Sequence, residues 1–141
     1  MVLTFRLMWM SSRGSRAFGS AGAGQLFSDY VGRLGKFCRT RVEGGTPSPG
    51  CWLCDRGAGS KMLASEQLSR LLGNELSSGS KSLEVAIGPA EGLRPGEAER
   101  LRPALRWSFG PATLPHELAA VVAAEQLYRA WCILRNIPYH K

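Results

Sequence analysis

The sequence predicts an α/β layer fold with a mainly parallel sheet, and three observations lead to this prediction. Short apolar runs suited to strands alternate with longer segments whose apolar residues recur at helical spacing. Seventeen glycines and eight prolines supply the turns that such an alternation requires. The 141 residues are enough for one domain with a real core, spanning 1–141, and hardly enough for two.

The composition excludes several classes of protein. A hydrophobic content of 44% with a charged content of 21% excludes a disordered chain. No apolar run reaches the roughly 18–20 residues that cross a membrane, so we expect no membrane partner. The 18 basic residues outnumber the 11 acidic ones and give a net charge of +7. This balance suits a phosphate-rich partner, although charge by itself identifies none.

The start of the chain is predicted to fold as strand, helix and strand. Residues 2–10 read as an apolar strand, 26–37 as a helix with apolar residues on one side, and 39–42 as a second strand. Seven basic residues and one acid in 1–42 are also typical of a mitochondrial transit peptide. We prefer a mature folded start, because a transit peptide needs no strand ahead of its helix.

The chain has four cysteines, which are too few for a secreted disulfide scaffold of this length. Two of them stand in a C-x-x-C arrangement. Cys51 and Cys54 fall in a predicted third strand, residues 50–55, which follows a Gly- and Pro-rich loop at 43–50. Residues three apart on a strand point to opposite faces, which opposes zinc chelation and disulfide closure. We therefore expect buried reduced thiols, no metal and a cytoplasmic protein, with a zinc or redox site as the alternative.

The remaining chain continues the alternation. Ser65 is predicted to cap the next helix, with Glu66 in its first turn. The predicted elements are a Gly-rich turn (56–61), a helix (63–76), a strand (83–87), a short charged helix (94–102), a strand (105–109) and a long helix that follows residue 115 and ends near residue 136.

Two turn-rich loops, residues 88–93 and 109–115, directly follow apolar strands. Ligands of open α/β sheets bind just beyond the carboxyl ends of the strands, so these loops predict a ligand site. Neither loop matches GxGxxG or the P-loop pattern, which excludes those nucleotide-binding motifs. Glycine in such turns can also serve the backbone alone, and each loop taken singly leaves that interpretation open.

The last helix carries a charged pair on an apolar stripe. At 100° per residue, Glu125 and Arg129 fall in the middle of a stripe formed by Leu118, Val121, Val122, Cys132 and Ile133. Burying an acid and a base is costly unless the two are paired and hydrogen-bonded. Two interpretations stay open: a structural ion pair, for example in a subunit interface, or a charged pair at an active site.

Several ordered motifs together match the pattern of one known family. They are Ile87-Gly-Pro-Ala-Glu-Gly-Leu93, Trp107-Ser-Phe-Gly-Pro-Ala-Thr-Leu-Pro-His116, Glu125-Gln-Leu-Tyr-Arg-Ala-Trp131 and a Tyr-His pair at 139–140. These motifs resemble the ribosomal RNA large subunit methyltransferase H (RlmH) family of the SPOUT class. The resemblance covers nearly the whole chain and is strongest from about residue 53 onward.

The resemblance implies a trefoil-knotted α/β fold, in which one segment threads through a loop, and a homodimer. Family members transfer a methyl group from S-adenosyl-L-methionine to N3 of a pseudouridine in 23S rRNA on the ribosome. The resemblance therefore implies this activity, this methyl donor and this RNA partner. A SPOUT enzyme with another RNA target, and a non-catalytic RNA- or ribosome-binding relic, are the alternatives.

Carried over by position, the resemblance implies two groups of site residues. Those holding the methyl donor are Cys54, Gly88, Phe109, Gly110, Pro111, Ala112, Thr113 and Leu114. Those acting at the target base, within one subunit or across the dimer, are Glu125, Arg129, Tyr139 and His140, with His116 as a further candidate. Arg129 is expected to stabilise charge or contact an rRNA phosphate. Thr113 is expected to cap the last helix, with Pro115 in its first turn.

The chain departs from the family pattern in three places. Pro89 and Ala90 replace a Gly-Pro pair, and Pro89 removes a backbone N–H. Gly110 and Ala112 replace a serine and a Met or Leu. A longer segment with a helix is expected in the family where this chain has only residues 43–50. These changes concern the affinity for the methyl donor and the packing of the N-terminal half.

Overall fold

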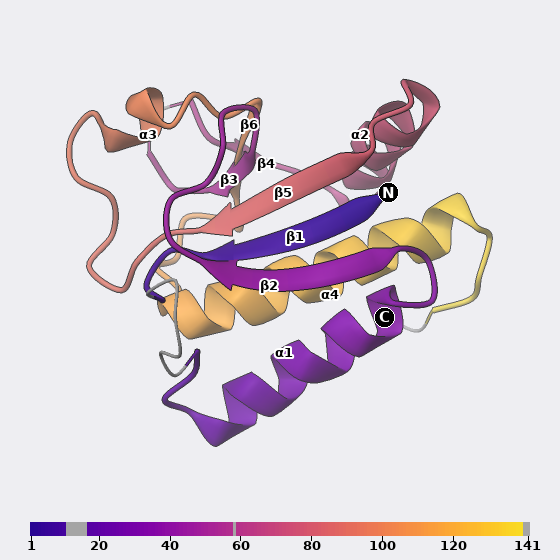
Figure 1. Cartoon of the computed structure of the whole chain (residues 1–141), viewed down its shortest axis with the longest axis horizontal. Helices are drawn as coiled ribbons and strands as arrows, with labels where there is room; N and C mark the ends of the chain where they lie inside the picture. The colour runs from indigo at the N-terminus through magenta and orange to yellow at the C-terminus, as the bar shows by residue number, and fades with distance from the viewer. Residues whose placement is uncertain (11–16, 58, 140–141) are drawn as a thin grey trace.

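The structure, a computed structural model, describes residues 1–10, 17–57 and 59–139. In this part of the chain six strands form one sheet in the order β2-β1-β5-β3-β6-β4, and every neighbouring pair is parallel (Figure 1). The strands are β1 (Val2–Leu7), β2 (Arg39–Gly44), β3 (Trp52–Cys54), β4 (Lys61–Met62), β5 (Ser82–Ile87) and β6 (Leu105–Ser108). The predicted parallel α/β sheet is confirmed, whereas the threading of a knot stays a prediction.

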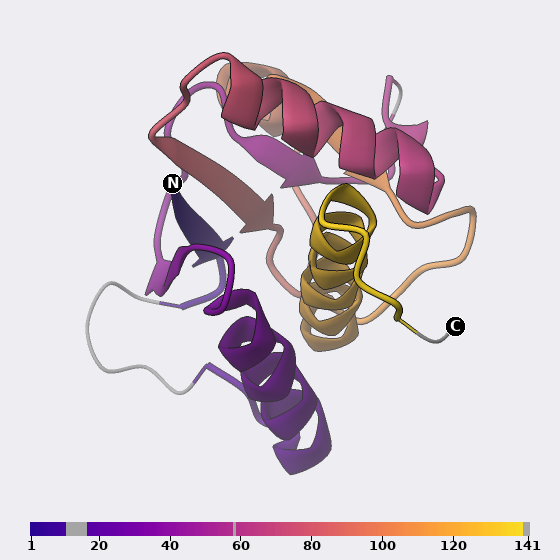
Figure 2. The same ribbon diagram turned by 90° about the vertical axis from the view of Figure 1, so that its right-hand side faces the viewer.

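Three helices cover one face of the sheet. They are α1 (Ala21–Leu34), α2 (Ser65–Ser77) and α4 (His116–Leu134), and α4 packs against both of the others (Figures 1 and 2). The short helix α3 (Glu97–Arg100) contributes Ala98 to a smaller cluster on the opposite face. The sheet is therefore buried on both sides around β3 and β5, as parallel sheets usually are.

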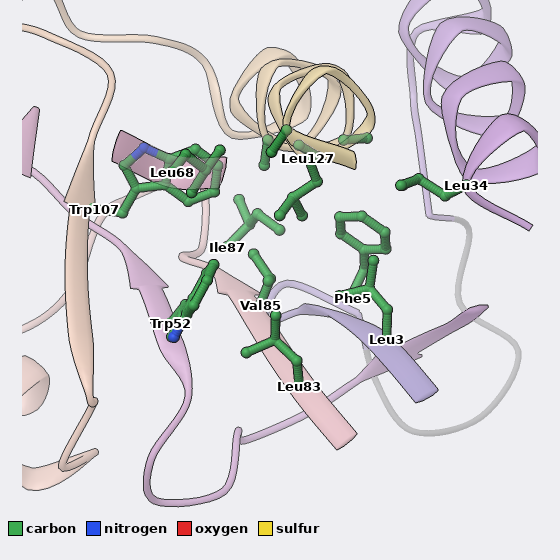
Figure 3. Close-up of a cluster of buried hydrophobic side chains, with 14 of the residues drawn as sticks. Leu3, Phe5, Leu34, Trp52, Leu68, Leu83, Val85, Ile87, Trp107 and Leu127 are labelled. Carbon is green, nitrogen blue, oxygen red and sulfur yellow. The ribbon is translucent and has the colours of Figure 1, made fainter. Parts of the chain in front are cut away.

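The main core lies between the sheet and these three helices. Alternate residues of β1, among them Phe5, point toward α1 and α4, and Val85 and Ile87 of β5 do the same (Figure 3). Leu127 of α4 is fully buried against them (Figure 3). The period-2 alternation that predicted the strands is the pattern that fills this core.

The C-x-x-C cysteines lie on opposite faces of the sheet, as predicted. Cys51 packs in the smaller cluster with Leu53 and Ala86, whereas Cys54 packs against the main core. All four cysteines are free. Burial raises the pKa of the Cys51 thiol to about 11 and raises that of Cys54 as well, so both stay protonated at neutral pH. The described residues contain no cluster suited to a metal ion.

Several predicted boundaries are corrected by local chemistry. The first strand ends at Leu7, and α1 begins at Ala21, capped by the Ser20 hydroxyl, which accepts from the Ala23 N–H at 3.4 Å. The predicted turn at 56–61 ends in the short strand β4, and the predicted helix at 94–102 contracts to α3. Gly96, with φ of 79°, stands at the start of α3 and blocks an earlier beginning.

The two predicted helix caps are wrong. Ser65 is the first residue of α2, and the cap is formed by Gln67, whose side-chain oxygen accepts from the Ala64 N–H at 2.7 Å. Thr113 does not cap α4, because Pro115 occupies the N-cap position and Thr113 stays in the preceding loop. In both helices another residue, Ala64 or Pro115, occupies the N-cap position from which a hydroxyl could accept the first N–H groups.

Candidate functional site

A pocket of about 450 Å³ opens beyond the carboxyl ends of β3, β5 and β6, where the two predicted ligand loops meet the start of α4. This is the left-hand side of the molecule in Figure 1. The lining comprises residues 54–57, 87–93 and 112–114 together with Trp107, Phe109, His116 and Ala119. The topology of the parallel sheet thus assembles segments that are far apart in the sequence into one site.

Six of the eight residues expected to hold a methyl donor line this pocket. They are Cys54, Gly88, Phe109, Ala112, Thr113 and Leu114. Gly110 and Pro111 belong to the same loop without lining the pocket. The Gly110 N–H donates to the Ser108 hydroxyl at 3.2 Å, and the φ of Gly110 is +114°, a conformation that glycine adopts most easily. The replacement of serine by glycine therefore suits this loop's backbone.

Pro89 is accommodated in a tight turn at the rim of the pocket. The Gly92 N–H donates to the Pro89 carbonyl at 2.9 Å, and Gly92 supplies the left-handed φ of 81° that closes the turn. A Cβ at Gly88 would meet only Leu93, at 3.8 Å. A side chain at Gly88 would therefore intrude on the pocket without straining the backbone.

An ion pair that the sequence did not predict orders the loop after β3. The Arg106 guanidinium pairs with the Asp55 carboxylate, with Nε at 2.9 Å from Oδ2. Asp55 also accepts from the Gly57 N–H at 3.1 Å, and a Cβ at Gly57 would lie 2.6 Å from the Arg106 guanidinium. Arg56, next to this pair, donates to the Pro111 carbonyl at 3.0 Å and ties the two pocket loops together. The only indication of this ion pair in the sequence is that an acidic residue, Asp55, directly follows a buried strand.

Glu125, Arg129 and Tyr139 form a second cluster, which also includes Tyr30 of α1. Arg129 donates to the Glu125 carboxylate at 2.7 Å, and its guanidinium lies 4.7 Å from the centre of the Tyr139 ring. The Tyr139 hydroxyl donates to Glu125 at 2.9 Å and lies 3.4 Å from the Tyr30 hydroxyl. His140, the fourth residue predicted here, lies outside the described residues.

The environment of this cluster raises the pKa values of Tyr139 and Arg129. Burial, followed by the hydrogen bonds to Tyr30 and Glu125, raises the pKa of Tyr139, so its hydroxyl stays protonated at neutral pH. The hydrogen bond to Glu125 raises the pKa of Arg129. Glu125 accepts from Arg129, Tyr139 and the Gln126 amide, the last at 2.7 Å. The hydrogen bonds of the Glu125 carboxylate therefore hold Arg129 and Tyr139 in place.

The pocket lies at the amino end of α4 and the Arg129–Tyr139 cluster lies toward its carboxyl end; of the residues predicted to act at the target base, His116 lies at the pocket. His116, at the amino end, lines the pocket and packs edge-on against Trp9 with ring centres 4.5 Å apart. Arg129 lies 13 residues further along, which at 1.5 Å per residue is about 20 Å. One protomer therefore does not bring Arg129 and Tyr139 to its own pocket.

Part of the predicted apolar stripe of α4 faces out of the protomer, whereas its members Val121 and Cys132 are buried in the core. Leu118 and Ile133 are 42% and 39% exposed, and the Glu125 and Arg129 side chains between them are 17% and 21% exposed. The buried side of α4 is a different one, formed mainly by small residues and by Leu127 and Trp131. The predicted charged pair is confirmed, and it lies on an outward apolar face.

Residues 51–140 match a family described as "Predicted SPOUT methyltransferase". The protein named ribosomal RNA large subunit methyltransferase H from Rhodospirillum centenum is 35% identical over 95% of this chain and 98% of its own length. That alignment has 153 positions, more than the 141 residues of this chain, so the relative carries residues that are absent here.

Two proteins of the same name are more similar over shorter stretches. The protein from Thioalkalivibrio sulfidiphilus is 43% identical over 57% of this chain and 50% of its own length. The protein from Methylocella silvestris is 40% identical over 67% of this chain and 58% of its own length. In these two alignments the chain spans about half the length of the curated relative.

Proposed function

The chain belongs to the ribosomal RNA large subunit methyltransferase H family of SPOUT methyltransferases, and we propose that it methylates N3 of a pseudouridine in 23S rRNA on the assembled ribosome. The methyl donor would be S-adenosyl-L-methionine. The observation that carries the proposal is the meeting of both family loops, 87–93 and 107–114, around one pocket at the carboxyl edge of the sheet. This function would place the protein with ribosomes in the cytoplasm. No helix in the described residues could span a membrane.

The pocket fits this methyl donor in size and lining. Its volume of about 450 Å³ is within the usual range for small-molecule sites. Trp107 and Phe109, whose ring centres are 4.9 Å apart, supply aromatic surfaces that suit both an adenine and a sulfonium cation. Gly88 and Gly92 leave backbone groups open to close approach. The donor supplies an electrophilic methyl group, and the lining residues would position it and exclude water.

The outward face of α4 supports a homodimer. A stripe with two exposed large apolar residues around a satisfied ion pair is suited to burial against a second copy of itself. Pairing through α4 would also resolve the separation of about 20 Å within one protomer. We therefore propose that Arg129, Tyr139 and His140 of one protomer act at the pocket of its partner.

In this arrangement the residues of the second cluster would have distinct roles. Methylation breaks the N3–H bond of the base and forms an N3–carbon bond, so a proton must leave and negative charge develops on the imide. Arg129 would stabilise that charge. Tyr139, which keeps its proton, would donate a hydrogen bond, and Glu125 would hold both in place. His140 and His116 are the candidates for accepting the proton.

The function is tested with the purified protein, S-adenosyl-L-methionine and ribosomes from cells lacking the protein. We expect calorimetry to show binding of the methyl donor and mass spectrometry to show one N3-methylpseudouridine gained in 23S rRNA. Donor binding with methylation of a different RNA would favour another target, and absence of donor binding would favour the relic. Removal of residues 138–141 is expected to abolish methylation and to spare donor binding; an unchanged methylation rate would contradict the role of Tyr139 and His140.

A further inference from the structure

Basic side chains gather at the end of the molecule opposite the pocket. Figure 2 views this side, where α1 and α4 end and β1 begins. The Val2 N–H donates to the Lys81 carbonyl at 2.9 Å, and the Arg39 N–H to the Met1 carbonyl at 3.3 Å, so Lys81 and Arg39 lie at the starts of strands on either side of β1. With the exposed residues that end α1 and follow α4, they form what we call the basic rim: Arg33, Lys36, Arg39, Lys81 and Arg135.

Aromatic rings connect the basic rim to the Arg129–Tyr139 cluster. The Arg33 guanidinium lies 5.2 Å from the centre of the Tyr30 ring and 5.6 Å from that of Tyr128. Tyr128 packs edge-on against Tyr139, with ring centres 4.9 Å apart. The Arg135 guanidinium lies 5.5 Å from the centre of the Trp131 ring. The rim and the cluster are therefore one continuous surface.

The charge on the rim is not neutralised within the protomer. Among the described residues, none of the five rim side chains forms an ion pair. Arg6, by contrast, pairs with Glu43 and Glu84, and Arg106 pairs with Asp55. Other described basic residues, such as Arg56 and Arg70, also form no ion pair, but the five of the rim lie at the end of the molecule that carries Arg129 and Tyr139.

We propose that the basic rim is the surface that binds the RNA backbone of the substrate, an inference that rests on the function proposed above. Unpaired Lys and Arg side chains bind phosphates, and guanidinium groups beside aromatic rings suit a looped strand whose bases are unstacked. RNA lying along the rim would present its target base at Tyr139 and Arg129. The same protomer would then guide the RNA to the pocket of its partner.

The test compares two charge reversals of equal size. Lys36→Glu with Arg39→Glu alters the rim, whereas Lys61→Glu with Arg70→Glu alters β4 and α2, and all four side chains are exposed. Binding of a fluorescein-labelled RNA stem-loop is measured without methyl donor at several salt concentrations. We expect the rim variant to bind at least about tenfold more weakly, with a salt slope reduced by about 1.4 for two lost contacts. The control variant should stay within about twofold of the parent.

Each other outcome overturns the inference. Equal losses in both variants would show a response to net charge alone, and no loss in the rim variant would place the RNA elsewhere. Binding of the parent to anionic vesicles and not to the stem-loop would identify a lipid surface. If circular dichroism shows that the rim double variant is unfolded, RNA binding is instead measured for the single variants Lys36→Glu and Lys81→Glu and compared with that of Lys61→Glu. Because RNA binding is measured without methyl donor, failure of the parent to methylate ribosomes would refute the proposed function separately.

Discussion

The two ends of α4 are surrounded by different kinds of residues. At the amino end, loops rich in glycine and small residues surround a pocket. At the carboxyl end, long side chains dominate: Arg129, Tyr139 and the basic rim. Close backbone approach suits a small ligand, whereas long charged side chains suit a large anionic one.

This division explains why one protomer is an incomplete enzyme under the proposed function. His116 at the pocket and Arg129 in the second cluster are separated by about 20 Å of rigid helix. A bending of α4 cannot close that distance, because α4 is packed against α1 and α2 along the sheet. A second copy placed against the outward stripe can bring the two ends together.

The largest effect is expected from Arg129→Ala. Loss of the positive charge near the target base should lower the methylation rate about a hundredfold to a thousandfold. The affinity for S-adenosyl-L-methionine should change less than twofold, because Arg129 is proposed to act on the target base and is not among the residues that line the pocket. Turnover on ribosomes and calorimetry measure the two quantities. Arg129→Lys, which keeps the charge, should recover part of the rate. If Arg129→Ala lowered the donor affinity as much as the methylation rate, Arg129 would belong to the donor site and the two sites would not be separate.

Disruption of the outward stripe is the next largest effect. Leu118→Asp with Ile133→Asp should convert the dimer into a folded monomer of about 15.3 kDa, because two charges cannot be buried in an apolar interface. Light scattering at micromolar concentration measures the mass. Leu26→Asp on α1, where Leu26 is 49% exposed, is the control and should leave the dimer intact. A parent that is itself a stable monomer would contradict the dimer.

Dimers that contain one protomer of each of two inactive variants test whether Arg129 acts at the pocket of its partner. Gly88→Trp should fill the pocket without straining the backbone, since a Cβ there meets only Leu93 at 3.8 Å. Neither Gly88→Trp nor Arg129→Ala should be active alone. Mixed by refolding in equal amounts, they should recover about a quarter of the parental rate, since half of the dimers have one complete site. No recovery would mean that Arg129 serves the pocket of its own protomer.

Local patterns were sufficient to predict the sheet and the pocket loops. Strand alternation around Phe5 and Val85, and Gly- or Pro-rich loops after apolar strands, are features of the sequence itself. The family resemblance supplied what the pattern could not, the assignment of Cys54 to the same site as the later loops. Asp55 and Arg106 could not be paired in advance, because β3 and β6 become neighbours only in the sheet.

The orientation of α4 shows why residue size can mislead a helical pattern. The large apolar residues Leu118 and Ile133 mark the exposed part of the predicted stripe, whereas its members Val121 and Cys132 are buried. The inner face is lined mainly by Ala120, Ala123, Ala124 and Ala130, which let the helix lie close to the sheet. Alanines carry a weak hydrophobic signal, so the helical pattern placed the centre of the apolar side too far toward the exposed Leu118 and Ile133 and away from the alanine-lined core side.

The smallest expected effect concerns the hydrogen bonds of Glu117, which hold the amino end of α4. The Glu117 carboxylate accepts from the backbone N–H groups of Gly19 at 2.9 Å and Ser20 at 3.1 Å, and so ties the start of α1 to the start of α4. The hydrogen bond from Gly19 is the main cause that lowers the pKa of Glu117 below its ordinary value of 4.5. A carboxylate with a lowered folded-state pKa stabilises the protein above its unfolded-state pKa, and this contribution is lost as the pH falls through the folded-state pKa.

Glu117→Gln should therefore reduce the free energy of unfolding at pH 7 by no more than about 1 kcal/mol, because the carboxylate lies near the surface. The difference between variant and parent should shrink as the pH falls below about 4.5, since the parent then loses its charged acceptor. Urea unfolding at several pH values measures it, with Glu66→Gln at the exposed start of α2 as the control for loss of one negative charge. A difference that stays constant down to acid pH would show that the charge of Glu117 does not hold this end of α4, and that neutral hydrogen bonds alone join it to α1.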